Sequence, residues 1–367
     1  MNTENTSINQ SINQSIGETE INEVISRMFY SLRYILSVLV VFIHSKITPE
    51  QINFLTANGR DVTFPNSSFV RVIEDLITRG LGCCAVPMFF FISGFILFKK
   101  NEQYKVLIQK KLHSLVIPFL LWTFINIIFF VIINGNFSVL KSLTLYEWEK
   151  VVLGYGNEYT NPLLGTLWFM RDLIIISLIC PIIVFLIKKF PVEYGFAIVI
   201  LLFNKIELIS FYDRIGTGLC FFSLGGYAAM YESVFMRVLK KANIILLIVL
   251  FIINFIFIEN FVCSRILVFV SSFIFFKFAD FIIKNNEGYE LLKKCSIYSF
   301  FLYASHFMVF TGFIELGWLR LFPMTNALFQ LFDFFGIALV KIVLFTFIGI
   351  FLRKICPPAF RLLNGGR

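Results

Sequence analysis

Residues Arg33 to His44, RYILSVLVVFIH, form a mostly apolar stretch that begins with an arginine and ends with a histidine. The stretch lies within a longer apolar segment, 27–46, which has about the 20 residues that a helix needs to cross a bilayer. Charged and titratable side chains are costly inside a membrane, so they usually face a protein interior and mark functional sites. The stretch therefore predicts a membrane helix whose two polar ends have a function.

The composition indicates that the rest of the chain is built in the same way. Of its 367 residues, 58% are hydrophobic and 48 are phenylalanine. A soluble domain has too little interior to bury so much apolar surface, and the apolar runs lack the two-residue alternation of a membrane barrel strand. We therefore predict an all-α integral membrane protein. The net charge of +9 is explained by membrane topology, so we expect no nucleic-acid partner.

Ten apolar segments can be marked along the sequence. They are 27–46, 80–98, 114–135, 163–187, 191–204, 214–231, 242–258, 263–283, 296–314 and 330–352. If the amino terminus is cytoplasmic, the connections richest in Lys and Arg all fall on the cytoplasmic side, as topology rules require. Those connections are 99–113, 188–190, 232–241, 284–295 and the tail from Arg353. We expect about ten transmembrane helices with both termini in the cytoplasm, in a multi-pass protein of a bacterial-type cytoplasmic membrane.

The ends of the chain differ in composition from the apolar segments. Residues 1–24 are polar and contain the tandem SINQSINQSI, which predicts a disordered cytoplasmic tail. Residues 25–355 are expected to form the membrane domain, and 356–367 a short cytoplasmic tail. The seven cysteines are scattered without a CxxC pair, so we expect neither a disulfide framework nor a metal site.

Helical geometry relates the two polar ends of the opening stretch. Eleven residues at about 100° each end roughly 20° past three full turns, so Arg33 and His44 lie on one face, roughly 16 Å apart. Arg33 then lies in the inner half of the membrane and His44 near its outer boundary. The alternative is that Arg33 snorkels inward and His44 is an interfacial residue. Ser93 and Gly94 in the second segment lie at the depth of Arg33, where Gly94 allows close approach of a ligand or is a packing notch.

Other charged residues are also expected within the membrane. Arg171 and Asp172 are adjacent and point about 100° apart, so we expect each to pair elsewhere. Lys341, at a similar depth, is a candidate partner for Asp172. Lys277 and Asp280 are three residues apart and predict a structural pair.

Several short motifs, in this order, resemble the membrane-bound acyltransferase type 3 family, which includes bacterial O-acetyltransferases of surface sugars. The motifs are Arg33-(ten residues)-His44, FFFISGFIL at 89–97, IPFLLW at 117–122, LWFMRDL at 167–173, LGGY at 224–227 and YASH at 303–306. The basic cluster before the proline is thinner than is usual in that family. Lys110, Lys111, His113 and Ser114 stand where arginines are often found.

The resemblance implies transfer of an acyl group, acetyl in the simplest case, from acyl-CoA to a hydroxyl of a carbohydrate or glycolipid of the cell envelope. It implies His44 and Arg33 as catalytic residues. Supporting residues of the site or substrate channel would be Ser93, Gly94, Trp168, Arg171, Asp172, Tyr303 and His306. Considered by itself, His306 would equally fit a packing residue that is held by a hydrogen bond. Acyl-CoA would be a co-substrate, with no permanently bound cofactor.

The residue types suit that chemistry. A neutral histidine is a suitable base for a hydroxyl, and arginine offers fixed donors to an oxyanion or a phosphate. Lysines at the cytoplasmic edge are expected to hold the nucleotide end of CoA. They are Lys99, Lys100, Lys105, Lys110 and Lys111. Both direct transfer and an acyl-enzyme intermediate remain open.

The same buried polar residues also fit a transporter or flippase for a glycan, a lipid or a small acid. Many transporters contain repeated halves, whereas neither the first-segment motif nor the SGF segment is duplicated in this sequence. This difference favours the enzyme. A non-catalytic scaffold or sensor is the third alternative, and the sequence leaves the acceptor and the oligomeric state open.

Overall fold

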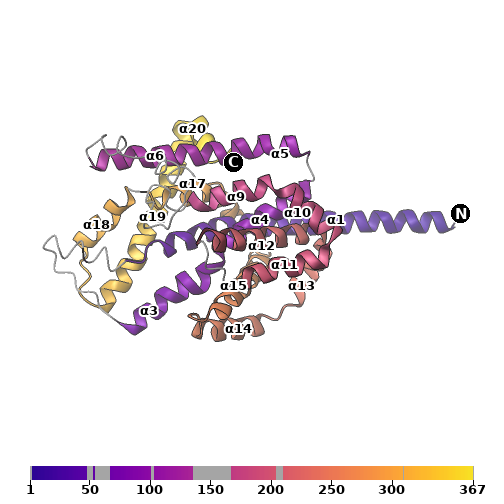
Figure 1. Ribbon diagram of the computed structural model, residues 1–367, viewed down its shortest axis with the longest axis horizontal. Helices are drawn as coiled ribbons and strands as arrows, with labels where there is room; N and C mark the ends of the chain where they lie inside the picture. Colours follow the sequence, from indigo (N-terminus) through magenta and orange to yellow (C-terminus); the bar gives the residue numbers. More distant parts are fainter. Residues whose placement is uncertain are drawn as a thin grey trace.

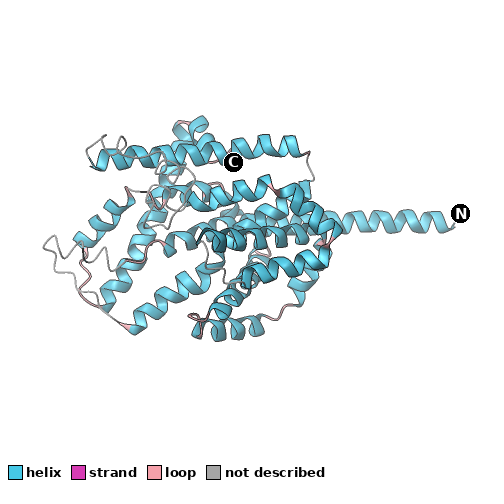
Figure 2. Cartoon of the chain, viewed as in Figure 1, coloured by secondary structure: helices cyan, strands magenta, loops and turns pink. Residues whose placement is uncertain are grey.

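The computed structural model describes residues 2–47, 53, 67–100, 103–134, 167–203, 210–308 and 310–366. At 2–19, 134 and 210–214 it describes the backbone only. Within these residues the chain is all helix and short connections (Figure 2), which confirms the predicted fold class. In chain order the helices are α1 (Asn2–Ile43), α3 (Ser68–Asp75), α4 (Ala85–Lys100), α5 (Tyr104–Lys111), α6 (Ile117–Asn134), α9 (Trp168–Leu178), α10 (Cys180–Lys189), α11 (Pro191–Phe203), α12 (Ser210–Met230), α13 (Glu232–Lys241), α14 (Ile244–Ile256), α15 (Phe261–Ile282), α16 (Asn286–Ser296), α17 (Ser299–Ser305), α18 (Thr311–Leu321), α19 (Ala327–Ile355) and α20 (Pro357–Leu363).

Five helical stretches in the described residues are long and apolar enough to cross a membrane. They are Glu20–Ile43, Ser68–Lys100, Tyr104–Ile133, Phe261–Ile282 and Ala327–Ile355. Two bent pairs, α9 with α10 and α12 with α13, raise the number to seven if each pair is one span. The protein therefore has five to seven candidate spans here, and the short apolar helices α11 and α14 are additional. Ten spans and cytoplasmic termini stay predictions.

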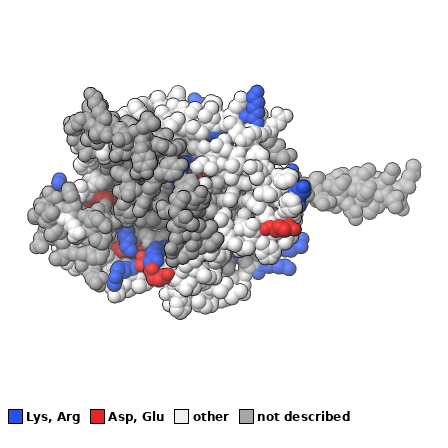
Figure 3. Space-filling view, viewed as in Figure 1, with Lys and Arg blue, Asp and Glu red and all other residues white. Residues whose placement is uncertain are grey.

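Helix α1 runs lengthwise through the bundle, and its amino-terminal part projects beyond the other helices (Figure 1). Its inner turns are fully buried, as at Leu32 and Leu36, and pack in the main core with residues of α4, α9, α12, α15 and α17. On the visible face, charged atoms lie beside the projection and in a mixed acidic and basic group toward the other end, and further Lys and Arg atoms lie along the upper edge (Figure 3). The disordered tail predicted for 1–24 stays a prediction.

Asparagine side chains fix the start of several helices. In each case the Oδ1 atom accepts hydrogen bonds from two backbone N–H groups of the first turn, which would otherwise have no partner. These N-caps are Asn243 for α14, Asn260 for α15, Asn285 for α16 and Asn326 for α19. Local sequence thus sets where these helices begin.

Glycines allow α4 and α12 to pack with their backbones in contact. A Cβ built on Gly94 would overlap the carbonyl oxygen of Phe222, and a Cβ on Gly225 would overlap that of Phe91. The SGF motif of α4 and the LGGY motif of α12 are therefore two halves of one helix contact. Gly94 serves as the packing notch that was one of its two expected roles.

This contact makes a testable prediction. The substitution Gly225→Ala should lower the free energy of unfolding by about 1–3 kcal/mol, because the methyl group would meet backbone that cannot rotate away. Gly312→Ala is the matched control, since nothing lies within 4 Å of its added Cβ. Thermal unfolding of the two purified variants in detergent measures the difference, and equal midpoints would contradict the close packing.

The ninth apolar segment, predicted as one helix over 296–314, is broken. Helix α17 ends at Ser305, a turn follows at His306, and α18 starts at Thr311. Side chains take backbone carbonyls at the break: His306 Nδ1 lies 2.7 Å from the oxygen of Tyr303, and Thr311 Oγ1 donates to Met308 over 2.7 Å. Such local bonds compete with helical ones, and non-helical backbone at this depth is tolerated because protein surrounds it.

Candidate functional site

A cavity of about 640 Å³ opens between α1, α4, α5, α9, α10 and α17. Three residues predicted for the site on three different helices line it: Arg33 on α1, Ser93 on α4 and Tyr303 on α17. Their side chains share one space because the helices that carry them pack around the same core. The volume lies within the range of small-molecule sites.

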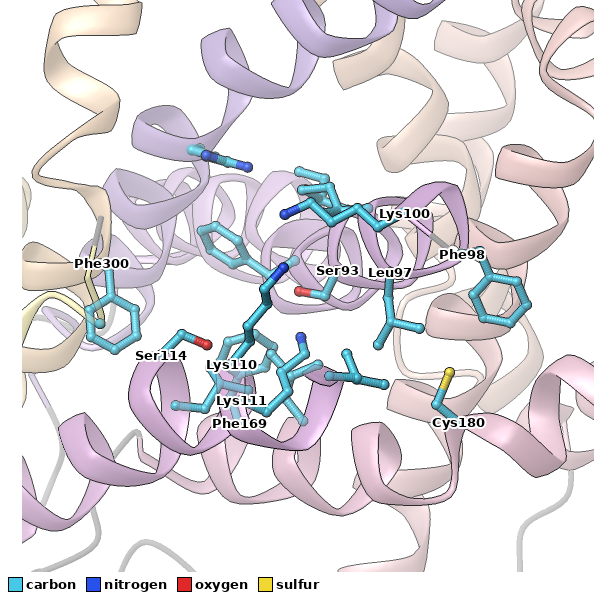
Figure 4. A pocket seen from close by; sticks show the side chains of 18 of the residues that line it. Ser93, Leu97, Phe98, Lys100, Lys110, Lys111, Ser114, Phe169, Cys180 and Phe300 are labelled. Carbon is cyan, nitrogen blue, oxygen red and sulfur yellow. The ribbon is translucent and has the colours of Figure 1, made fainter. Parts of the chain in front are cut away.

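Cations gather at this cavity. Lys100 reaches in from α4, and Lys110 and Lys111 reach in from α5 (Figure 4). Lys188 of α10 is a fourth lysine in the lining. Among the described residues that line the cavity there is no Asp or Glu, so its field favours an anion.

The remaining two lysines of the predicted set are elsewhere. Lys99 forms a 2.6 Å ion pair with Glu232, and Lys105 is exposed on α5; neither lines the cavity. Lys188 was missed because the sequence places it in a different cytoplasmic connection, and only the bend between α9 and α10 brings it to the others.

Arg33 is held on the cavity wall by its own helix. Its guanidinium lies 4.9 Å from the ring centroid of Tyr30, one turn earlier. One turn later, Ser37 donates a hydrogen bond of 2.8 Å to the carbonyl of Ser299 and joins α1 to the start of α17. The contact fixes the position of Arg33 relative to Tyr303.

The carboxyl end of α1 brings His44 against His306. Their ring centroids are 5.4 Å apart, and Phe307 packs on His44 at 4.5 Å. His306 is fully buried, and its Nδ1 must carry the proton because the carbonyl of Tyr303 can only accept. Nε2 of His306 is then a lone-pair acceptor, and it has no hydrogen-bond partner among the described residues.

Tyr303 links this histidine pair to the cavity. Its side chain lines the cavity, and its ring centroid is 6.1 Å from that of His306. His44 is not part of the cavity lining. The arrangement is therefore a basic cavity with Arg33 and Tyr303 on its wall, and two histidines behind Tyr303.

A buried ion pair supports His44 from the other side. Lys341 of α19 donates to the backbone carbonyl of His44 over 3.1 Å and pairs with Glu315 of α18 at 2.5 Å. The side chain of Lys341 is 0% exposed. The proposed pairing of Lys341 with Asp172 is therefore wrong, because α18 brings a nearer carboxylate to the lysine.

Arg171 and Asp172 pair directly with each other, contrary to expectation. Asp172 Oδ1 accepts from Arg171 Nε at 2.8 Å and from Nη2 at 2.7 Å, and both side chains are buried in α9. The 100° offset between neighbours separates the Cβ atoms, but the long arginine side chain folds back across it. Neither residue lines the basic cavity or the cavity beside Trp168.

The predicted pair of Lys277 and Asp280 is also wrong. Lys277 donates to the carbonyl of Lys240 over 3.1 Å, and Asp280 pairs with Lys284 at 3.1 Å. Lys277 thus reaches across to α13, and Asp280 pairs with a lysine one turn later, just beyond the end of α15.

Trp168, the last predicted site residue, lines a second cavity of about 420 Å³. Arg79 and Arg265 also line it. In the described parts of the chain, no three His, Cys, Asp or Glu side chains are grouped so that they could hold a metal ion.

A family profile and one relative match the chain. The profile of a protein family described as an acyltransferase domain matches residues 31–353. The chain is also 26% identical over 171 residues to the succinoglycan biosynthesis protein ExoH of Rhizobium meliloti (strain 1021). That similarity covers 44% of this chain and 42% of the relative, so the chain matches less than half of the relative's length. No solved structure matches the chain.

Proposed function

Because the chain belongs to the acyltransferase domain family, we propose that it transfers an acyl group, acetyl in the simplest case, from acyl-CoA to a hydroxyl of an envelope carbohydrate or glycolipid. The observation that carries the proposal is the continuity from the basic cavity, through Arg33 and Tyr303, to the pair His306 and His44. The name of the relative, a succinoglycan biosynthesis protein, supports a polysaccharide acceptor. We further propose ten spans, cytoplasmic termini and residence in the cytoplasmic membrane.

The donor would enter the basic cavity. CoA carries phosphates at its nucleotide end, and lysine ammonium groups bind phosphate as point charges. Lys100, Lys110 and Lys111 would hold those phosphates at the end that opens toward α5. The pantetheine arm would then lie along the apolar lining and pass Arg33 toward Tyr303 and the histidine pair.

The transfer itself needs a base and an electrophile. His44 would take the proton from the acceptor hydroxyl while the oxygen of that hydroxyl attacks the thioester carbonyl. The C–O bond forms, the C–S bond breaks, and the CoA thiolate leaves. Arg33, three turns of α1 away from His44, would instead hold a phosphate of the donor by charge-assisted hydrogen bonds. His306, whose ring packs against that of His44, would position that ring.

Membranes that contain the protein, incubated with labelled acetyl-CoA and extracted envelope glycans, test the proposal. The expected result is label in the glycan that depends on the protein and is released by mild base, as an ester is. Protein-dependent flux of a glycan across vesicle membranes, without any transfer of label, would overturn the proposal and favour the transporter.

The cavity lysines make a separate prediction. Lys110→Gln should raise KM for acyl-CoA by about tenfold, the size of effect expected from one charge-assisted phosphate contact. Lys105→Gln is the matched control, because Lys105 lies on the same helix but outside the cavity. Steady-state kinetics at two salt concentrations measure the change, and equal KM values for the two variants would contradict donor binding here.

A further inference from the structure

The second cavity lies across a thin aromatic wall from the first. On α4, Phe89 lines the basic cavity and its neighbour Phe90 lines the second. On α9, Phe169 lines the basic cavity and its neighbour Trp168 lines the second. The ring centroids of Phe90 and Phe169 are 4.7 Å apart in an edge-to-face contact. Two rings in contact, one lining each cavity, therefore separate the two spaces at this point.

The second cavity also reaches the carboxyl end of α1. Ile43, the last residue of α1, lines it, and His44 follows directly. A ligand in this cavity would therefore lie beside the end of α1 that carries His44, across the aromatic wall from the acyl donor. An acceptor placed there would be next to the donor cavity without competing with CoA for the same space.

The lining of the second cavity has the chemistry of an acidic sugar site. Trp168 offers a flat ring face, and the hydroxyl oxygens of Thr78 and Ser264 retain acceptor capacity after donating to backbone carbonyls. Arg79 and Arg265 are its charged residues, and its described lining contains no carboxylate. Two planar guanidinium groups suit a carboxylate, which arginine binds through two parallel hydrogen bonds.

Arg79 already binds a carboxylate at the mouth of this cavity. Its Nη1 lies 2.5 Å from Oε1 of Glu259, whose side chain is 83% exposed in the turn between α14 and α15. The guanidinium lowers the pKa of the Glu259 carboxyl below its usual value. An ion pair in water contributes little free energy, so a carboxylate on a ligand can replace Glu259.

We propose that the second cavity binds the acceptor and that Arg79 and Arg265 select a sugar that carries a carboxylate. That the bound sugar accepts an acyl group rests on the proposed function. The binding site itself is assigned from the lining residues alone. Selection arises because a neutral sugar of the same size leaves the two guanidinium groups without the added ionic contacts.

The test compares two acceptors of equal length, an oligosaccharide with glucuronic acid units and its neutral glucose counterpart, with labelled acetyl-CoA as donor. The wild-type protein is expected to favour the acidic acceptor by about tenfold or more in kcat/KM. Arg265→Gln and Arg79→Gln should each bring that ratio toward one. Arg265→Lys should restore part of the ratio, since it keeps the charge and loses the planar fork.

Arg71→Gln is the matched control, because Arg71 is exposed on α3 and does not line the cavity. Each variant should elute like the wild type in size-exclusion chromatography and keep its KM for acetyl-CoA, which excludes a misfolded bundle. A ratio that is unchanged in Arg265→Gln and Arg79→Gln, or a wild-type preference for the neutral acceptor, would overturn the proposal.

Binding without turnover separates this inference from the proposed function. Equilibrium dialysis of the two labelled oligosaccharides against the purified protein reports the site directly. Tighter binding of the acidic one that is lost in Arg265→Gln supports the site even if no acyl group is transferred. Equal binding of the two oligosaccharides would contradict the proposed acidic-sugar site even if transfer occurs.

Discussion

The variant His44→Ala should transfer acyl groups about 10²–10⁴-fold more slowly than the wild type, the usual contribution of a positioned general base. The loss should fall on kcat and leave KM for acyl-CoA near its original value, because His44 does not line the donor cavity. Single-turnover measurements with labelled acetyl-CoA at saturating acceptor give the rate. The expectation rests on the position of His44 at the end of α1 against His306.

The chain supplies a matched control for this variant. His113 is exposed, and its Nδ1 bonds to the carbonyl of Gln109 in its own helix, so His113→Ala should transfer at the wild-type rate. If His306 positions His44, the double variant with His306→Ala should be little slower than His44→Ala alone, since residues that act as a unit are not additive. A folded His44→Ala protein that transfers at the normal rate would contradict the assignment of His44 as the general base.

Lys341→Met should lower the free energy of unfolding by about 3–5 kcal/mol, because it leaves the carboxylate of Glu315 buried without its cation. Transfer should fall as well, since Lys341 also holds the backbone carbonyl of His44. Thermal unfolding in detergent measures the first effect. The second is read from the transfer rate at a temperature below the unfolding range of the variant.

Two further variants test the physical reason. Adding Glu315→Gln to Lys341→Met should recover most of the lost stability, because both charges are then gone. Lys354→Met, on the exposed end of the same helix, should change the unfolding midpoint little. If the double variant is no more stable than Lys341→Met, the loss does not come from an uncompensated carboxylate.

The sequence predicted much of this architecture because apolar length determines membrane helices directly. The all-helical class follows from it, and depth arguments placed Arg33 and Ser93 at one level, where the structure has both on one cavity wall. The depth of a residue in a membrane helix follows from counting residues along the chain. The place and direction of a break in a helix do not follow from such a count. The sequence therefore named His44 and His306 without predicting that their rings meet.

The break in the ninth segment explains the main error among the ion pairs. Ending that segment at 314 puts Glu315 in an outer loop, where it is no partner for a buried lysine. In the structure the chain turns at His306 and continues as α18, which buries Glu315 beside Lys341. The pairing of Arg171 with Asp172 was missed for a different reason, since it depends on a side-chain rotamer and not on helical spacing.

The aromatic wall between the two cavities has an electrical consequence. With the basic cavity on the cytoplasmic side, as proposed, water in both cavities would concentrate the transmembrane voltage across that layer. A unit charge that crosses a potential of 100 mV exchanges about 2.3 kcal/mol with the field. An uncharged acyl group crosses without electrical work, whereas the polyanionic carrier left behind would not. Transfer of the acyl group alone would therefore leave the membrane potential unchanged.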